Sequence, residues 1–321
     1  MEKFLIKRLF QSVFILFLAS MIAFAVIHFA PGDPLYMYTT PGVAQVELSP
    51  EEIEQMRQSL GLDGSIVEQY IRWLGNTISG NWGKSVINYR PVLEQINERI
   101  PSTLALMGTG LIISIILAIP LGLISGSNEN NFIDQIISFF TYIGISIPQF
   151  WLGLILIIIF SMNLKWLPSS GMRTTGVESF WDLAKHAVLP VTVLVLNNLA
   201  VFIRYIRSST INELNQDYVL AAKSKGVKHH DILIQHVLRN CLLPFITVVG
   251  MNISTLLAGS IVIENVFAWP GLGTLTLNAI NNRDYPLVMG TVIISSVVLL
   301  AGNLIADILY QIVDPRISLE E

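Results

Sequence analysis

Six long apolar runs alternate with polar segments along the chain. The runs lie near residues 9–30, 104–126, 136–162, 187–206, 241–263 and 287–313. A bilayer core about 30 Å thick is crossed by about 20 residues of helix, and each run reaches that length. None of the runs alternates with a period of two, as the roughly ten-residue strands of a membrane barrel do. The pattern predicts an all-α polytopic membrane protein with six transmembrane helices.

The composition agrees with a membrane protein. The 321 residues are 52% hydrophobic and only 13% charged, whereas soluble domains are about 25% charged. The formal net charge is −4 and neither sign dominates the chain, so nothing indicates a nucleic-acid partner. The single cysteine, Cys241, excludes a disulfide framework and a multi-cysteine metal site.

The first apolar run invites comparison with a signal peptide, because Lys3, Lys7 and Arg8 precede it. The run extends over more than 20 residues, from Leu9 to Ala30, whereas a signal core has roughly 7–15. We therefore expect this segment to be retained as the first span.

The positions of basic residues predict the orientation, because lysine and arginine in short loops mark the cytoplasmic side. Three precede the first span. Six more lie at or after the end of the fourth span, at Arg204, Arg207, Lys223, Lys225, Lys228 and Arg239. We expect both termini on the cytoplasmic side of the membrane.

This orientation divides the chain into four regions. They are a cytoplasmic tip with the first span (1–30), an extracytoplasmic helical domain (31–103), a five-helix membrane core (104–313) with a cytoplasmic loop at 207–240, and a cytoplasmic tail (314–321).

Two helices are expected in the extracytoplasmic domain, 31–103. SPEEIEQMRQSLGL begins with Ser49 as N-cap and Glu52 at the capping-box position. IVEQYIRWLGN, starting at Ile66, has Tyr70 and Trp73 on one amphipathic face.

The motif GNWGKS, at residues 80–85, resembles the end of a phosphate-binding loop. Such a loop requires a glycine five residues before Gly83, where the chain has Ile78. The segment is also expected to face away from cytoplasmic ATP. We therefore do not expect the chain to bind a nucleotide.

The stretch DYVLAAKSKGVKHHDILIQHVLRN, residues 217–240, is basic and interrupted by a glycine. Its pattern predicts two short helices separated at Gly226, where a positive φ is tolerated. Lys223, Lys225 and Lys228 would each cost several kcal/mol in the middle of a bilayer, so the stretch does not span. From the residues alone it is either an amphipathic connector on anionic lipid or a docking element for a cytoplasmic partner.

Ala221 and Ala222, followed by Gly226, resemble the cytoplasmic loop of ATP-binding-cassette (ABC) importer permeases. Leu220 stands where that motif has glutamate, and Arg239 stands where many members have proline. DYVLAAKSKGV together with HVLRNCLLP (236–244) is similar to the oligopeptide, dipeptide and nickel branch of this family.

Further segments of that branch follow in order along almost the whole chain. They are HFAPGDP (28–34), LGLDGSIVEQYIRWLGN (60–76), GNWGKS (80–85), ERIPSTLAL (98–106), GISIPQFWLGLILI (144–157), WLPSSG (166–171), VIENVFAWPGLGTL (262–275), RDYPLVMG (283–290), NLIADILY (303–310) and DPRI (314–317). GLDGS departs from a commoner GLD-x-P, which puts in doubt only the geometry of that turn.

The resemblance implies a type I ABC importer permease fold and a non-enzymatic, multi-pass permease subunit in the inner membrane of a prokaryote. With a homologous permease the chain would form a heterodimeric path for oligopeptides or dipeptides, fed by an extracytoplasmic binding protein and driven by two cytoplasmic ATPase subunits. ATP and Mg would be bound by those ATPases, and this chain would bind no cofactor. Nickel chelates or oligosaccharides are alternative substrates, and an ATP-independent transporter or channel is an alternative class.

The resemblance also implies which residues couple the chain to the ATPase. They are Asp217, Tyr218, Ala221, Ala222, Lys225 and Gly226. His229, His230 and His236 in the same stretch lack ligand spacing, so we expect no metal there.

Polar residues inside spans and the turn after the fifth span are candidates for the path or its outer gate. They are Asn197, Asn252, Glu264, Trp269, Pro270 and Gly271. Buried asparagines could equally join helices by hydrogen bonds, as could Asn198 and Asn303. Glu264 could meet a charged substrate terminus, dock the binding protein, or form a salt bridge with Arg283.

Overall fold

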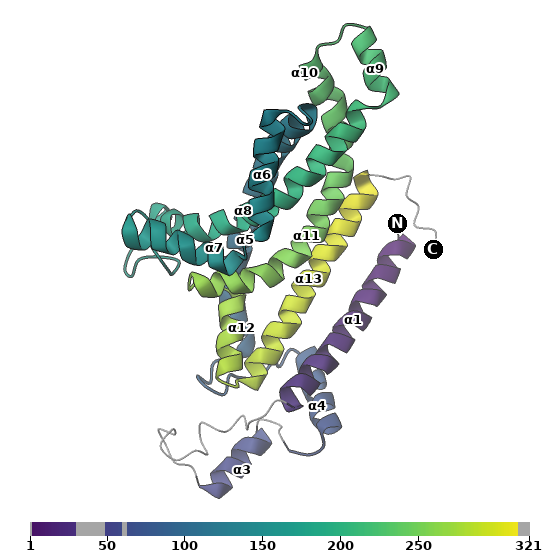
Figure 1. Ribbon diagram of the computed structural model, residues 1–321. Coiled ribbons are helices and arrows are strands. Elements are labelled where there is room, and N and C mark those ends of the chain that lie inside the picture. Colours follow the sequence, from purple (N-terminus) through teal and green to yellow (C-terminus); the bar gives the residue numbers. More distant parts are fainter. Residues whose placement is uncertain (1, 30–48, 60–62, 314–321) are drawn as a thin grey trace. The chain divides into compact units, whose positions relative to one another are not determined.

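The structure is a computed structural model that describes residues 2–29, 49–59 and 63–313 (Figure 1). In these residues the regular structure is helical, apart from an isolated bridge between Lys84 and Pro91. The helices are α1 (Glu2–Phe29), α3 (Pro50–Ser59), α4 (Ile66–Ile78), α5 (Val92–Ser127), α6 (Phe132–Ser146), α7 (Gln149–Leu156), η1 (Ile157–Asn163), α8 (Phe180–Leu214), α9 (Asp217–Ser224), α10 (His229–Asp231), η2 (Ile232–Val237), α11 (Leu238–Val266), α12 (Leu272–Asn281) and α13 (Tyr285–Val313).

Four of the described helices are long and apolar enough to cross a membrane: α1, α5, α8 and α13. Two bent pairs of helices raise the number to six if each pair counts as one span. The predicted all-α membrane protein is thereby confirmed, and the number of spans agrees with the predicted six when both bent pairs cross.

The third predicted span, 136–162, is not a single helix. α6 ends at Ser146, and the helix formed by α7 and η1 leaves at an angle of 102°. The break lies at Ile147, which is extended with ψ 123°, and Pro148. A residue before proline is disfavoured in the α region, and proline has no N–H to donate to the preceding turn.

Several helices extend beyond the apolar runs. α8 continues to Leu214, so Arg204 and Arg207, which the sequence assigned to a loop, belong to the helix. α5 likewise begins at Val92, well before the predicted start at 104. Hydropathy marks only the part of a helix that lies in lipid, whereas the backbone hydrogen bonds continue through its polar ends.

Contacts divide the chain into two compact units, residues 1–100 with 274–298 and residues 101–273 with 299–321. In the first unit the expected capping box is present at α3. The Ser49 N–H donates to Glu52 Oε2 at 2.8 Å, and the Glu52 N–H donates to Ser49 Oγ at 3.3 Å. The same reciprocal pair, Ser65 and Glu68, begins α4. HFAPGDP beyond Phe29, the turn at 60–62 and DPRI lie outside the described residues.

The second unit has α8 at its centre, packed against α6, α7 and α11 (Figure 1). One buried cluster gathers around Trp269 and Phe267. Another gathers around Phe202 and Phe245, whose rings meet edge to face with centroids 5.3 Å apart. α9 and α10 follow at one end of α8 and α11, outside the long helices (Figure 1).

Candidate functional site

The stretch 217–240 forms two short helices separated at Gly226, as predicted. α9 ends in a Schellman motif. The Gly226 N–H donates to Lys223 O at 3.0 Å, and the Val227 N–H donates to Ala222 O at 3.2 Å. Gly226 has φ +77°, and a Cβ placed there would meet no atom within 4 Å. The left-handed backbone therefore favours glycine here, while the space around it is open.

This stretch has a small hydrophobic core of its own. Val219, Ile232, Val237 and Cys241 are fully buried in it. The core joins α9, η2 and the start of α11, so the two arms are packed together. We call residues 214–241 the coupling element.

The six predicted coupling residues separate into an outer and an inner group. Tyr218 and Ala222 are half-buried and pack against the core of the coupling element. Four are exposed: Asp217, Ala221, Lys225 and Gly226. Leu220, which stands where the family motif has glutamate, is also exposed, at 57%. Of the six predicted coupling residues, only the outer group is exposed enough to contact a partner.

A hydrogen-bond cluster fixes the base of the coupling element. Glu213 Oε2 accepts from the Tyr218 hydroxyl at 2.6 Å and from Asn240 Nδ2 at 3.0 Å. Burial, followed by the hydrogen bond to Glu213, raises the pKa of Tyr218 to about 12. The tyrosine therefore stays a neutral donor at physiological pH, and the cluster ties α8, α9 and α11 together. Sequence reasoning missed Glu213 and Asn240, which no spacing rule connects.

Glu264 is completely buried near the end of α11. Its Oε1 accepts a hydrogen bond from the Thr103 hydroxyl at 2.7 Å, and its Oε2 accepts one from the Gly273 N–H at 2.6 Å. Thr103 Oγ1 in turn accepts from the Leu272 N–H at 2.8 Å. The carboxylate and the threonine thus satisfy backbone donors at the start of α12, which otherwise have no intrahelical partner.

The turn that follows α11 closes around this carboxylate. A Cβ on Gly271 would lie 2.3 Å from Glu264 Cδ, so the residue at this position has to be glycine. Trp269 is buried, and its Nε1 donates to Ser102 O at 3.1 Å. Pro270, which stands between Trp269 and Gly271 in the sequence, is half-buried. The structure therefore brings together the predicted residues Glu264, Trp269, Pro270 and Gly271 in one turn, which we call the carboxylate turn.

The predicted asparagines do not join that turn. Asn197 is half-buried in α8, and Asn252 Nδ2 donates to Val248 O of its own helix at 2.7 Å. The neighbouring Asn198 is buried, and its Nδ2 has no hydrogen-bond partner within the described part of the chain. Asn303 is half-buried in α13.

A partly buried ion pair that sequence reasoning missed joins α6 to α8. Asp134 and Arg207 form two hydrogen bonds, both 2.7 Å long, from Arg207 Nε and one terminal nitrogen. Asp134 also accepts from Ser125 and from the Asn130 N–H, so the turn between α5 and α6 is held against α8. The signal in the sequence was one charge of each sign next to the end of an apolar run, Asp134 before 136–162 and Arg207 after 187–206, but nothing in the spacing pairs the two.

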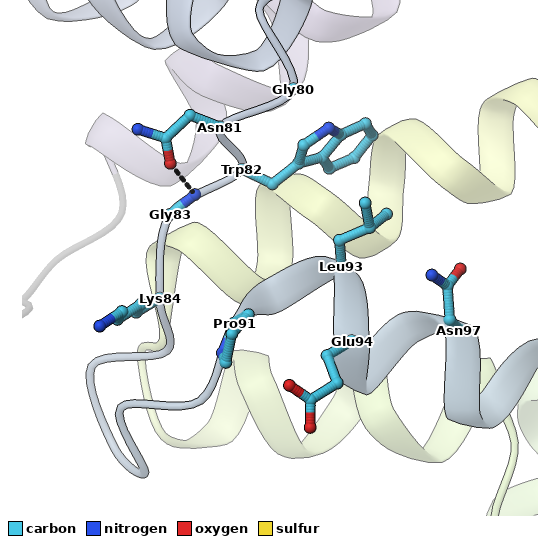
Figure 2. A pocket seen from close by; sticks show the side chains of 9 residues that line it. All are labelled: Gly80, Asn81, Trp82, Gly83, Lys84, Pro91, Leu93, Glu94 and Asn97. Carbon is cyan, nitrogen blue, oxygen red and sulfur yellow. Dashed lines mark hydrogen bonds between the residues drawn. The ribbon is translucent and has the colours of Figure 1, made fainter.

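GNWGKS borders an open cavity of about 580 Å³ (Figure 2). The Gly83 N–H donates to Asn81 Oδ1 at 3.2 Å, the Ser85 N–H to Arg90 O at 3.0 Å and the Val86 N–H to Asp284 Oδ1 at 3.2 Å. The Lys84 side chain points away from Trp82 (Figure 2). These amides already have acceptors in the protein, so they do not form a cradle for phosphate.

Among the residues that the structure describes, no three His, Cys, Asp or Glu side chains are grouped as metal ligands. The three histidines of the coupling element are exposed. What the geometry shows instead is a helical protein with several candidate membrane spans, in which two long helices, α8 and α11, are joined by a folded element of short helices.

The chain belongs to the family of binding-protein-dependent transport system inner membrane components, which it matches over residues 118–319. Residues 1–107 match the N-terminal component of the same systems. The resemblance inferred from the motifs is confirmed. The chain is a non-enzymatic, multi-pass permease subunit of an ABC importer, and this class implies an ATPase, a substrate-binding protein and a permease partner.

Three known proteins show how far the similarity extends. An oligopeptide transport system permease of Bacillus subtilis (strain 168) is 41% identical over 99% of this chain and 100% of its own length. A glutathione transport system permease of Escherichia coli (strain K12) is 35% identical over 99% of both chains. A chain of the inward-facing MetNI methionine ABC transporter has the same fold, with a TM-score of 0.52, 16% identity, and coverage of 69% of this chain and 97% of that one.

Proposed function

We propose that this chain is one of two homologous permease subunits that form the path of an oligopeptide or dipeptide importer. The full-length relatives named for oligopeptide and glutathione transport support a peptide substrate. Two ATPase subunits would supply the energy, and an extracytoplasmic binding protein would deliver the peptide. The orientation that fits the distribution of lysine and arginine has both termini in the cytoplasm, with residues 31–103 on the outer side.

The observation that carries this proposal is the coupling element. Its separate core and the Glu213 cluster make it a rigid unit attached to α8 and α11. A rigid unit transmits a displacement of a docked ATPase into the long helices, whereas a flexible loop would absorb it. The small side chain of Ala221 and the open space at Gly226 let a partner backbone approach closely.

The carboxylate turn has a structural role in this proposal. Both oxygens of Glu264 accept hydrogen bonds from the turn and from α5. The turn therefore holds the ends of α11 and α12 as a stiff support for an outer gate, and Glu264 does not reach a substrate in this conformation.

The test of the proposed function has two parts. The tagged protein is purified gently from its native membrane, and the proteins recovered with it are identified by mass spectrometry. We expect a homologous permease, ATPase subunits and a binding protein. Recovery of this chain alone would instead favour a self-sufficient transporter or channel.

The reconstituted complex is then assayed for ATP-dependent uptake of labelled di-, tri- and pentapeptides and of a nickel chelate. We expect uptake of peptides and none of the chelate. Uptake of the chelate alone would overturn the substrate class while leaving the permease function in place.

A further inference from the structure

α4, in the N-terminal unit, has an apolar surface wider than the part it buries within the chain. At about 100° per residue, its apolar side chains cover an arc of roughly 160°. One half of this arc, with Tyr70 and Trp73, packs against α1. The other half is exposed: Val67 at 65%, Ile71 at 63% and Ile78 at 78%. An exposed apolar stripe of this kind on a helix otherwise expected in water requires an explanation.

The contacts between α4 and α1 lie deep along α1. The Tyr70 hydroxyl and Ser20 Oγ are 2.9 Å apart, and the Tyr70 ring meets those of Phe17 and Phe24 edge to face. Phe17, Ser20 and Phe24 all lie within the candidate span Ile6–Phe29, so α4 packs against a part of α1 that is apolar enough to cross a membrane.

α1, the helix against which α4 packs, has an exposed apolar surface of its own. Only 6% of the most apolar window of α1 is buried within the chain. Phe10, Phe14, Ile22 and Val26 are all exposed on it. α1 is a candidate span whose exposed apolar side chains need apolar surroundings, and the α4 stripe lies on a helix that packs against this span through Tyr70 and Trp73. Acyl chains are thus the occupant that the neighbouring surface indicates.

The opposite face of α4 suits the boundary between lipid and water. Glu68 and Arg72 are exposed there, and Arg72 forms an ion pair with Asp63 at 2.5 Å. A helix with a charged face and an apolar face lies in the plane of the interface, with its apolar side in the boundary region of the acyl chains.

We propose that α4 is an interfacial membrane helix that lies against α1, with Val67, Ile71 and Ile78 in contact with lipid. It occupies the leaflet in which α1 ends, which is the outer leaflet if the N-terminus is cytoplasmic. The region 31–103 is then seated on the bilayer by α4, and α1 is held at a fixed depth by the Ser20–Tyr70 contact. Neither statement depends on the transported substrate.

The test places one nitroxide spin label at a time on the complete complex in phosphatidylethanolamine and phosphatidylglycerol vesicles. A Cys241→Ala background removes the single native thiol, and cysteines are introduced at Ile71 and Val67. Matched controls on the polar face of the same helix use Glu68 and Asn76, which are also exposed. We expect the ratio of oxygen to water-soluble nickel-complex accessibility to be several-fold higher at the first pair than at the controls.

Two outcomes would overturn the proposal. Equal access of the nickel complex to positions 71 and 68 would place α4 in water. Labels at 67 and 71 that are immobilised and shielded from both reagents would show that another subunit covers the stripe. Two independent positions keep the test decisive if one cysteine variant fails to assemble, and the result is read whether or not the complex transports peptides.

Discussion

Gly226 ends α9 in the coupling element and Gly271 precedes α12 in the carboxylate turn, yet their surroundings differ. Gly226 has φ +77°, and a Cβ added there would have no atom within 4 Å. Gly271 needs no left-handed backbone, but its Cβ would lie 2.3–2.4 Å from the Glu264 carboxylate. The first glycine is set by the conformation of the chain, and the second by the space left by a buried side chain.

The comparison separates three reasons for a small residue that look alike in a sequence. A positive φ and an internal close approach can be recognised within one chain, and Gly226 and Gly271 are examples of each. A close approach by an external partner leaves a small residue exposed, as Ala221 is. Gly271→Ala tests the internal close approach. Gly226→Asn and Gly226→Trp test whether a partner approaches the outer surface.

Gly271→Ala has the largest expected effect. The added methyl group overlaps a carboxylate that cannot withdraw, since Thr103 and the Gly273 N–H hold it. Overpacking of this kind costs about 3 kcal/mol. We expect loss of most assembled complex, measured as yield and as the temperature of half-inactivation in detergent. Gly108→Ala is the control, because a Cβ there meets no atom within 4 Å. An unchanged inactivation temperature in Gly271→Ala would contradict the steric explanation.

Glu264→Gln has the next largest effect. The amide keeps the shape of the carboxylate, but its NH₂ group cannot accept, so either Thr103 Oγ1 or the Gly273 N–H loses its acceptor. A buried donor without a partner costs about 1–3 kcal/mol, so the complex should inactivate at a lower temperature. The exposed Glu178, changed to Gln, should have no effect. A Glu264→Gln complex of normal stability with altered preference for charged peptides would show instead that the carboxylate meets the substrate.

The sequence predicted the helical class, the capping box at Ser49 and the turn at Gly226. Each of these depends on local spacing, which is visible in one segment. The bend at Pro148 was also visible locally, but hydropathy averaged over the run concealed it.

Pairings between distant segments were not predictable in this way. Glu264 was assigned to a gate or to a salt bridge, whereas Thr103, 161 residues away, is one of its partners. Asp134 and Arg207 are separated by 73 residues. No periodicity connects such pairs, because they are selected by the packing of α5, α6, α8 and α11. What an exposed residue such as Ala221 contacts depends on another chain and lies beyond both sequence and fold.

Gly226 variants test whether the outer surface of the coupling element is a docking site. Gly226→Asn keeps the turn, since asparagine tolerates the left-handed region, but adds a side chain to the surface. Gly226→Trp adds a large one. We expect both complexes to assemble, with ATP-coupled uptake reduced in the first and abolished in the second.

Gly176 provides the matched control for these variants. It has φ +81° and equally open space, but it lies in the loop before α8. Its Asn and Trp variants should transport normally. If Gly226→Trp also transports normally, Gly226 is only a helix terminator and the docking assignment is wrong.

Tyr218→Phe has the smallest expected effect and tests whether the coupling element moves as one body. The change removes the hydroxyl that donates to Glu213, while Asn240 still donates to the same oxygen. Loss of one such hydrogen bond costs about 1 kcal/mol, so amides of α9 should exchange with deuterium several-fold faster while the complex remains assembled. Tyr205→Phe, at a half-exposed position of α8, controls for loss of a tyrosine hydroxyl.

If faster exchange in α9 is accompanied by weaker coupling of ATP hydrolysis to uptake, rigidity of the coupling element contributes to force transmission. Unchanged exchange would mean that the hydrophobic core around Val219 and Ile232 holds the element without the Glu213 cluster.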